Sequence, residues 1–153
     1  MRVHVMIVNT SRFGELQIDH ERVISFQQGI LGFPRYRRYA LIHPGEDSSF
    51  YWLQSVDTPD LAFVVTDPVL FVPSYKVHLR PEHMQELGLS TLDGTQVFVI
   101  VNKRGNVLTG NLQGPLVVNV DQCVGTQLVL SDRRYTTRFA LLELPSEVEA
   151  VPA

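Results

Sequence analysis

The sequence is poor in the residues that build disulfides and metal centres. It holds a single cysteine, Cys123, among 153 residues, which excludes an intramolecular disulfide and fits a reducing compartment. The five histidines show no H-x-x-x-H spacing, and no cysteine pair or H-E-x-x-H motif accompanies them. We therefore expect neither a metal site nor a cofactor.

Charged residues are also scarce, at 19% of the chain, and long apolar runs are missing. The 13 basic and 16 acidic residues give a formal net charge of -3. Because phosphate binding depends on clustered Lys and Arg, we expect no direct nucleic-acid binding. No run approaches the roughly 18 apolar residues of a membrane-spanning helix. We expect no membrane insertion and a cytoplasmic location.

What the chain does have is a globular composition, with 44% hydrophobic residues. A length of 153 residues is that of one compact domain. We predict a single β domain over residues 1–144. Residues 145–153, PSEVEAVPA, carry two prolines and little apolar surface to offset the entropy of ordering, which predicts a flexible C-terminal tail.

Short apolar runs separated by turn residues recur along the chain. They predict strands over residues 3–8, 15–18, 22–26, 39–42, 51–56, 61–66, 75–79, 96–102, 107–110, 116–120 and 127–130. Short strands at such spacing indicate a mainly β fold, a small antiparallel β-barrel or a barrel-like sandwich. One short helix is predicted from Pro81 to about Leu87, with proline at its first position and Gly88 placed to end it.

Reactive side chains form no recognisable catalytic motif. Ser25, Ser55 and Ser131 lie in or beside predicted strands without a G-x-S-x-G elbow. Gly29 and Gly32 precede no helix, so they cannot place a phosphate at a helix N-terminus. We expect no catalytic residues and no enzyme activity. A small β-barrel enzyme, with a pocket assembled only by the fold, stays open as an alternative.

Residues 50–68, FYWLQSVDTPDLAFVVTDP, form the most informative segment. Two apolar runs flank a polar turn at residues 57–60, which predicts strand, turn, strand. Alternation places Tyr51 and Leu53 on one face and Phe50, Trp52 and Gln54 on the other. Trp52 suits strand packing and partner contact equally, since strands are rich in aromatic residues and Trp is a favoured interface anchor.

Two loops carry further signals. In GILGFP, residues 29–34, three large apolar residues lie in a loop, and we favour core packing over partner contact for Ile30, Leu31 and Phe33. In GNLQGPLVVN, residues 110–119, Asn111 and Gln113 precede a predicted strand, and a plain turn accounts for both.

Local charge clusters are few. Arg133, Arg134 and Arg138 in SDRRYTTRF favour a solvated strand edge over a grip on a carboxylate surface or an RNA phosphate. Asp57, Asp60 and Asp67 lie within the informative segment and suit a basic partner, although turn formation explains the first two. A direct RNA-binding barrel is a further alternative.

The three segments together resemble the flagellar assembly factor FliW family, whose members carry similar F-x-x-LQS-x-x-x-PDLAFVV-x-DP, GIPGF and TANLxAPIVIN patterns. The likeness runs from about Thr10 to Arg138 and includes a Y-x-x-R at residues 135–138. Leu31 stands where GIPGF has proline, and Gly110 and Gly114 stand where TANLxAP has alanines. These departures predict a looser loop and a more permissive backbone.

The resemblance implies a cytoplasmic flagellar assembly factor that binds flagellin and antagonises the translational repressor CsrA by protein–protein binding, which couples flagellin synthesis to export. Its implied partners are flagellin and CsrA, without nucleic acid, membrane or cofactor. The partner-binding residues expected from the motifs are Trp52, Gln54, Asp57, Asp60, Asp67, Asn111 and Gln113.

Overall fold

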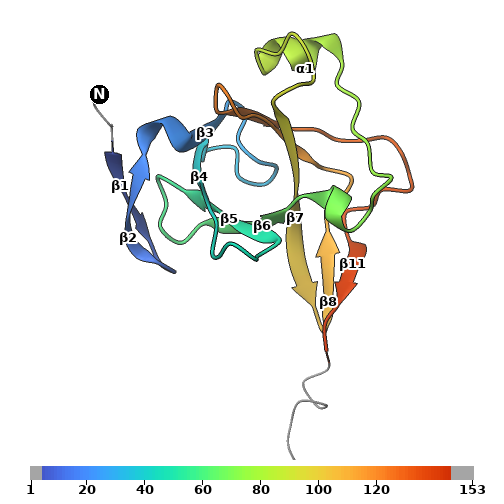
Figure 1. The fold of residues 1–153 in the computed structure, drawn as a ribbon, viewed down its shortest axis with the longest axis horizontal. Helices are drawn as coiled ribbons and strands as arrows, with labels where there is room; N and C mark the ends of the chain where they lie inside the picture. The colour runs from blue at the N-terminus through green and yellow to red at the C-terminus, as the bar shows by residue number, and fades with distance from the viewer. Residues whose placement is uncertain (1–4, 146–153) are drawn as a thin grey trace, which may run out of the picture.

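The computed structural model of the protein describes residues 5–145, which hold eleven strands, one α-helix and two short 3-10 helices (Figure 1). The strands are β1 (Val5–Thr10), β2 (Gly14–Asp19), β3 (Val23–Phe26), β4 (Arg38–Ile42), β5 (Phe50–Ser55), β6 (Ala62–Thr66), β7 (Thr95–Arg104), β8 (Val107–Gly110), β9 (Leu116–Asn119), β10 (Val124–Gln127) and β11 (Phe139–Glu143). The helices are η1 (His20–Arg22), η2 (Pro68–Leu70) and α1 (Pro81–Glu86).

A closed barrel forms the body of the fold. Strands β7, β6, β5, β4, β3, β10 and β9 pair in that order, and β9 pairs back with β7, so the ring is complete. Each of these pairings is antiparallel except that of β3 with β10, which is parallel. Figure 1 looks into this ring. The predicted barrel with one short helix is confirmed.

Two smaller units flank the barrel (Figure 1). The second half of β7 leaves the ring and pairs with β8, and β8 pairs with β11, so three strands project from the barrel. Strands β1 and β2 form a separate antiparallel hairpin beside it. The outward face of β1 exposes Val5 and Ile7, at 52% and 61% of their surface, while Val8 is buried.

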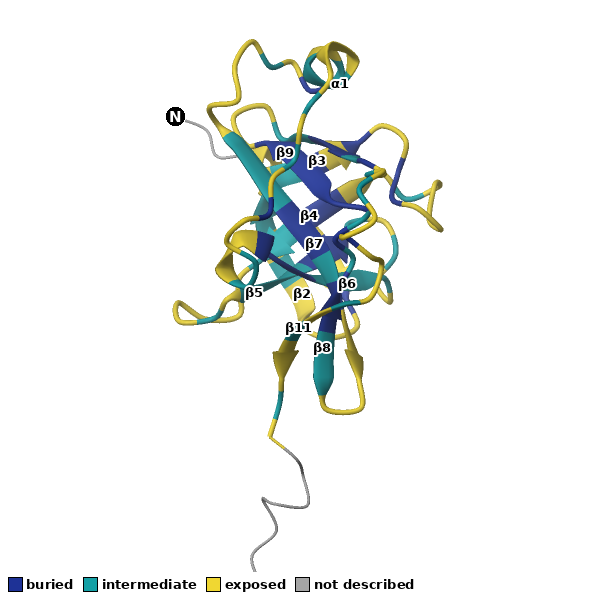
Figure 2. Ribbon diagram, turned by 90° about the vertical axis from the view of Figure 1, so that its right-hand side faces the viewer, coloured by how far each residue is buried: buried dark blue, intermediate teal, exposed yellow. Residues whose placement is uncertain are grey.

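The barrel interior is filled by apolar side chains. One cluster draws on β3, β4, β5, β6, β7 and β9, and its largest members include Phe26, Tyr39, Leu53, Phe98 and Leu116. Phe26 and Tyr39 meet edge to face with ring centroids 5.7 Å apart, an arrangement that aromatic pairs prefer. Figure 2 shows that burial is concentrated in the barrel strands and that the loops are exposed.

The segment between β6 and β7 covers part of the outer barrel face. Val99 of β7 packs with Tyr75, and Val117 of β9 packs with Leu87 just after α1. Helix α1 begins with proline at its first position and has no side-chain cap, and the left-handed Gly88 (φ +67) follows it. The predicted helix is confirmed.

Two predicted strands are wrong, and two strands, β10 and β11, were missed. Residues 75–79 alternate buried and exposed side chains, but they lie across the outer face without strand partners. Residues 128–130 follow β10, and the amides of Leu128 and Leu130 donate to the carbonyls of Pro115 and Gln113 without forming a strand. Strand β11 was not predicted. An alternation of apolar and polar residues indicates that one side of the segment is buried. It does not indicate that a neighbouring strand pairs with the segment.

Two sequence-based predictions concern the extent of the domain. The predicted tail, apart from Pro145, lies outside the described residues. The single domain over residues 1–144 stays a prediction. Within residues 5–145, no helix is long and apolar enough to cross a membrane.

The loop at residues 29–34 makes a direct test of backbone geometry possible. Gly29 and Gly32 both have positive φ, at +67 and +89, but a Cβ on Gly29 would lie 2.7 Å from the Phe33 carbonyl oxygen, whereas Gly32 has open space. We predict that Gly32→Ala lowers the free energy of unfolding by roughly 1–2 kcal/mol from backbone strain alone. Gly29→Ala should cost roughly 1–3 kcal/mol more because of the steric clash. Equal losses in urea denaturation would show that the close approach is absent.

Candidate functional site

Four segments taken from the family patterns lie at one end of the barrel. Strand pairing fixes this arrangement: β3 ends beside the start of β4, the end of β5 lies beside the start of β6, and β7 leaves the ring at the same end. Segment 110–115 begins where Gly110 pairs with Val101 and Phe139. We call this end, formed by residues 29–34, 57–60, 110–115 and 135–138, the motif end.

A buried glutamine shapes the acidic turn at the motif end. Gln54 is fully buried, and its amide Nε2 donates to the carbonyl oxygens of Ser55, Pro59 and Leu61 at 3.1–3.2 Å. Ser55 Oγ accepts from the amides of residues 57 and 58 at 3.2 and 3.0 Å. Buried hydrogen bonds of this kind fix backbone shape, because breaking one leaves a desolvated carbonyl unpaired.

The turn presents Asp57 and Asp60 at the surface. Asp57 pairs with the Arg38 guanidinium at 2.5 Å, and this hydrogen bond raises the pKa of Arg38. Both side chains are nearly half exposed, so the pair contributes little stability. Asp60 accepts a hydrogen bond from Ser11 Oγ of the β1–β2 hairpin, whose amide donates to the Pro59 carbonyl at 3.0 Å.

Trp52 lies beneath the tip of the same hairpin. The Arg12 guanidinium carbon is 4.5 Å from the Trp52 ring centroid, and the Phe13 ring meets the indole edge to face with centroids 6.0 Å apart. Trp52 therefore retains only partial exposure. A partner that contacts Trp52 also meets Arg12 and Phe13, which the sequence analysis did not single out.

The loop at residues 29–34 divides its apolar side chains between core and surface. Ile30 is 1% exposed and belongs to the barrel core, as predicted. Leu31 is 64% exposed, so the core-packing prediction is wrong for this residue. Phe33 is 38% exposed and packs against Phe63, with ring centroids 5.3 Å apart. Gly29 and Gly32 supply the positive φ angles that turn the loop outward.

A cleft of about 640 Å³ opens at the motif end, where β7 leaves the barrel. We call it the cationic cleft, because its charged lining residues are Lys103, Arg104 and Arg138. The remaining lining residues are Leu31, Ile100, Asn102, Thr109, Asn111, Gln127 and Thr137. Three of the four motif segments therefore border this cleft.

Gln127 connects two of these segments. Its Oε1 accepts from the Leu31 amide at 2.8 Å, and its Nε2 donates to the Gly114 carbonyl at 2.9 Å. A Cβ on Gly114 would lie 2.8 Å from Asn111 Nδ2 and 3.0 Å from Gln127 Nε2. Gly114 has no positive φ, so it makes room for these amides, and its predicted role in freeing the backbone is wrong.

Gly110 likewise makes room for a side chain. A Cβ there would lie 2.8 Å from the Leu141 Cδ1 atom, and Gly110 does not have a positive φ. The bulky Leu141 on β11 thus accounts for glycine where the family pattern has alanine.

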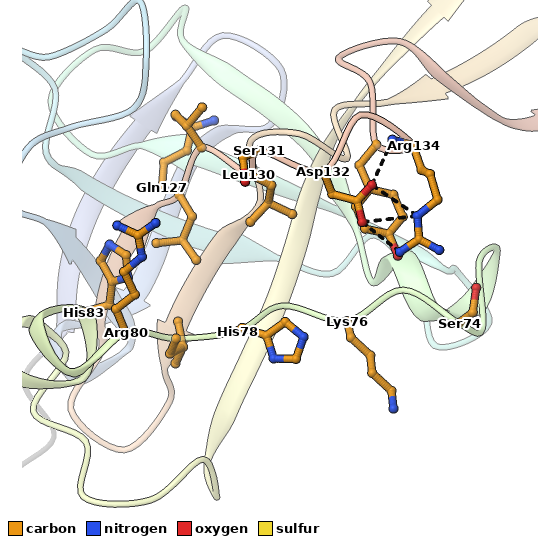
Figure 3. Close-up of a pocket in the computed structure, with 14 residues that line it drawn as sticks. Ser74, Lys76, His78, Arg80, His83, Gln127, Leu130, Ser131, Asp132 and Arg134 are labelled. Atoms are coloured by element: carbon orange, nitrogen blue, oxygen red, sulfur yellow. Dashed lines mark hydrogen bonds and ion pairs between the residues drawn. The ribbon is translucent and has the colours of Figure 1, made fainter.

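A second cleft, of about 520 Å³, lies between residues 74–83 and 127–135 (Figure 3). Its lining includes Lys76, His78 and Arg80 on one side and Asp132 and Arg134 on the other. Arg134 and Asp132 are joined by hydrogen bonds of 2.7–3.2 Å, which lower the pKa of the Asp132 carboxyl. This is an ordinary surface ion pair and not a poised acid and base.

The predicted arginine cluster is split between the two clefts. Arg134 lines the second cleft and Arg138 lines the cationic cleft, while Arg133 is exposed. The three side chains do not form one continuous surface for phosphate.

Two of the expected partner-binding residues lie away from the exposed surface of the motif end. Gln54 is 0% exposed, and its side chain holds the turn from within; its role in partner binding stays a prediction. Asp67 follows β6 at the opposite end of the barrel, where it accepts from the Val69 amide at 3.0 Å and caps η2. It does not join Asp57 and Asp60.

Asn111 and Gln113, which were also expected to bind a partner, lie at the motif end. Asn111 lines the cationic cleft and accepts from the Gly114 amide at 2.9 Å, which is the predicted turn. Gln113 is partly exposed, and its carbonyl accepts from Leu130. Sequence reasoning missed Lys103, Arg104 and Gln127, because only the fold brings them beside residues 31 and 138.

Groups suited to metal or nucleophilic chemistry are sparse in the described part of the chain. Across residues 5–145, no three His, Cys, Asp or Glu residues are grouped to hold a metal ion. Burial raises the pKa of the Cys123 thiol, whose Sγ donates to the Glu21 carbonyl, so the thiolate is disfavoured. Burial also raises the pKa of Tyr39 to about 12, inside the core.

Gln54 gives a stability prediction for the motif end. Gln54→Leu should lower the free energy of unfolding by about 1–3 kcal/mol, because the turn carbonyls lose their donor. Gln54→Glu should cost more at neutral pH, since a buried carboxylate faces only acceptors, and should recover partly in acid, where the protonated group donates. Wild-type denaturation midpoints for both variants would show that the glutamine does not hold the turn.

The packing around Trp52 gives a spectroscopic prediction. Arg12→Ala should shift the tryptophan emission to longer wavelength and increase quenching by acrylamide, because the indole loses its cover. Trp52 is the only tryptophan, so the signal has one source. Arg22→Ala, an exposed arginine in η1 at the other end of the barrel, is the matched control. Identical quenching of all three proteins would place Arg12 away from the ring.

Comparison with known proteins agrees with this geometry. The model of the FliW protein family matches residues 7–141. Flagellar assembly factor FliW of Alkaliphilus metalliredigens is 38% identical over 141 residues, covering 90% of this chain and 87% of the relative. The FliW of Leptospira interrogans is 34% identical over 139 residues, covering 89% and 93%.

A solved structure supports the same conclusion. A crystal structure of the flagellar assembly factor FliW superposes with a TM-score of 0.82 at 31% identity, covering 90% of this chain and 97% of that chain. The sequence match spans nearly all of the described barrel. The chain therefore belongs to the FliW family of flagellar assembly factors.

Proposed function

We propose that this FliW-family protein binds flagellin in the cytoplasm and, when free of flagellin, binds the translational repressor CsrA and antagonises it. The observation that supports this most is the gathering of four motif segments at one accessible end of the barrel. Together with Trp52 of β5, these segments present Asp57, Asp60, Asn111 and Gln113 without a reactive group among them. Binding, and not catalysis, is what such a surface offers.

The proposed control works by mass action. Flagellin that accumulates before export occupies the protein, which leaves CsrA free to repress translation; export of flagellin reverses that state. Coupling of this kind needs only that one partner weakens the binding of the other. The protein requires no cofactor for it.

The charges at the motif end favour protein partners of mixed character. Asp57 and Asp60 form an acidic surface suited to a basic protein such as an RNA-binding repressor. Trp52, with Arg12 and Phe13 over it, offers the aromatic and arginine contacts that dominate interface energies. Direct RNA binding lacks comparable support, since the arginines of residues 133–138 are divided between two clefts.

Calorimetric titration tests the proposal. The purified protein should bind cognate flagellin and cognate CsrA saturably, and each partner should weaken the binding of the other. Binding of neither authentic folded partner would overturn the proposal. Binding of both without mutual weakening would keep the two interactions and reject the switch.

Charge-neutralising variants locate the surface. Asp57→Asn combined with Asp60→Asn should weaken at least one partner about three- to ten-fold, since two exposed charge pairs together contribute roughly 1 kcal/mol. Asp67→Asn, at the opposite end of the barrel, is the matched control and should leave both affinities unchanged. A larger effect of Asp67→Asn would move the surface to the η2 end.

A further inference from the structure

The cationic cleft holds three basic side chains that no acidic side chain of the described residues pairs with. Among residues 5–145, the ion pairs join Arg38 to Asp57, Arg80 to Glu82 and Arg134 to Asp132. Lys103, Arg104 and Arg138 take part in none of these pairs, and all three are exposed. No acidic side chain of the described residues lines the cleft.

We propose that the cationic cleft binds an extended acidic segment of a partner protein. This inference rests on the proposed function, because it names the chemistry of the segment that a partner places at the motif end. Carboxylates there would receive charge-assisted hydrogen bonds from two guanidinium groups and one ammonium group, and arginine binds carboxylates in a bidentate fork.

The rest of the lining suits a peptide backbone and apolar side chains. The cleft volume of about 640 Å³ lies in the range of binding pockets. Asn102, Thr109 and Asn111 offer donors and acceptors to backbone amides. Leu31, 64% exposed on the rim, and Ile100 offer apolar contacts. A segment in which acidic and apolar side chains alternate would contact both the basic and the apolar residues that line the cleft.

Nucleic acid fits the same cleft less well. Single-stranded RNA is held by aromatic stacking together with basic grooves, and no aromatic side chain among the described residues lines this cleft. The net charge of -3 also opposes a polyanion that extends beyond three local cations. A short acidic segment avoids both difficulties.

A synthetic peptide of alternating leucine and glutamate, labelled with fluorescein, is the probe. Fluorescence anisotropy should show saturable binding to the full chain, and the matched leucine and glutamine peptide should bind far more weakly. Arg104→Gln combined with Arg138→Gln should weaken the acidic peptide at least about ten-fold, because charge-assisted hydrogen bonds are lost. Arg22→Gln, an exposed arginine outside the cleft, should change nothing.

Four outcomes overturn the inference. The acidic peptide binds no better than the glutamine peptide, or the double variant binds it as tightly as the wild type. A single-stranded RNA oligonucleotide binds the cleft more tightly than the peptide and loses that binding in the double variant. The peptide binds only after Glu147→Gln and Glu149→Gln, which would make the chain's own acidic C-terminal residues the occupant.

Titration with flagellin and CsrA separates this inference from the proposed function. If the wild type binds both partners but not the acidic peptide, the cleft inference fails and the proposed function stands. If the peptide binds in the cleft and neither partner binds, the proposed function fails and the partner is another acidic protein.

Discussion

The division of β7 between two pairings, with β9 in the barrel and with β8 outside it, is the constraint on which the rest of the structure depends. Residues 95–98 pair with β9 and close the barrel, whereas residues 101–104 pair with β8 outside it. A strand that pairs both inside and outside the barrel must leave the ring, and the cationic cleft opens where it does so. Shortening this strand at either end would remove either the closed core or the wall of the cleft.

The motif end depends on buried amides as much as on exposed charges. Gln54 holds the acidic turn from within, and Gln127 joins the loop at residues 29–34 to Gly114. Neither side chain needs to touch a partner to affect recognition, because each fixes the backbone that presents the exposed residues. Acidic and cationic surfaces thereby lie at one end of a single rigid barrel, available to partners of opposite charge.

Much of the fold was predictable because strand periodicity and turn residues are local signals. The informative segment gave β5, the turn and β6, and the proline and glycine around α1 marked its ends. The wrongly predicted strands have a common cause. Residues 75–79 alternate like a strand, but pairing depends on residues that are far away in the sequence. The candidate site shows the same contrast between local signals and contacts that only the fold makes. Asp57 and Asn111 were found from their own motifs, whereas Lys103 and Arg138 meet only in the fold.

The single parallel pairing in the barrel has a consequence for the newly made chain. Residues 25 and 26 of β3 pair with residues 124 and 125 of β10, so the ring cannot close until most of the 153 residues have been synthesised. Folds dominated by such long-range pairings form slowly, in milliseconds to seconds, since loop closure comes before the contacts that reward it. Until β10 has been synthesised, the apolar strands of the open sheet lack the partner that closes the barrel.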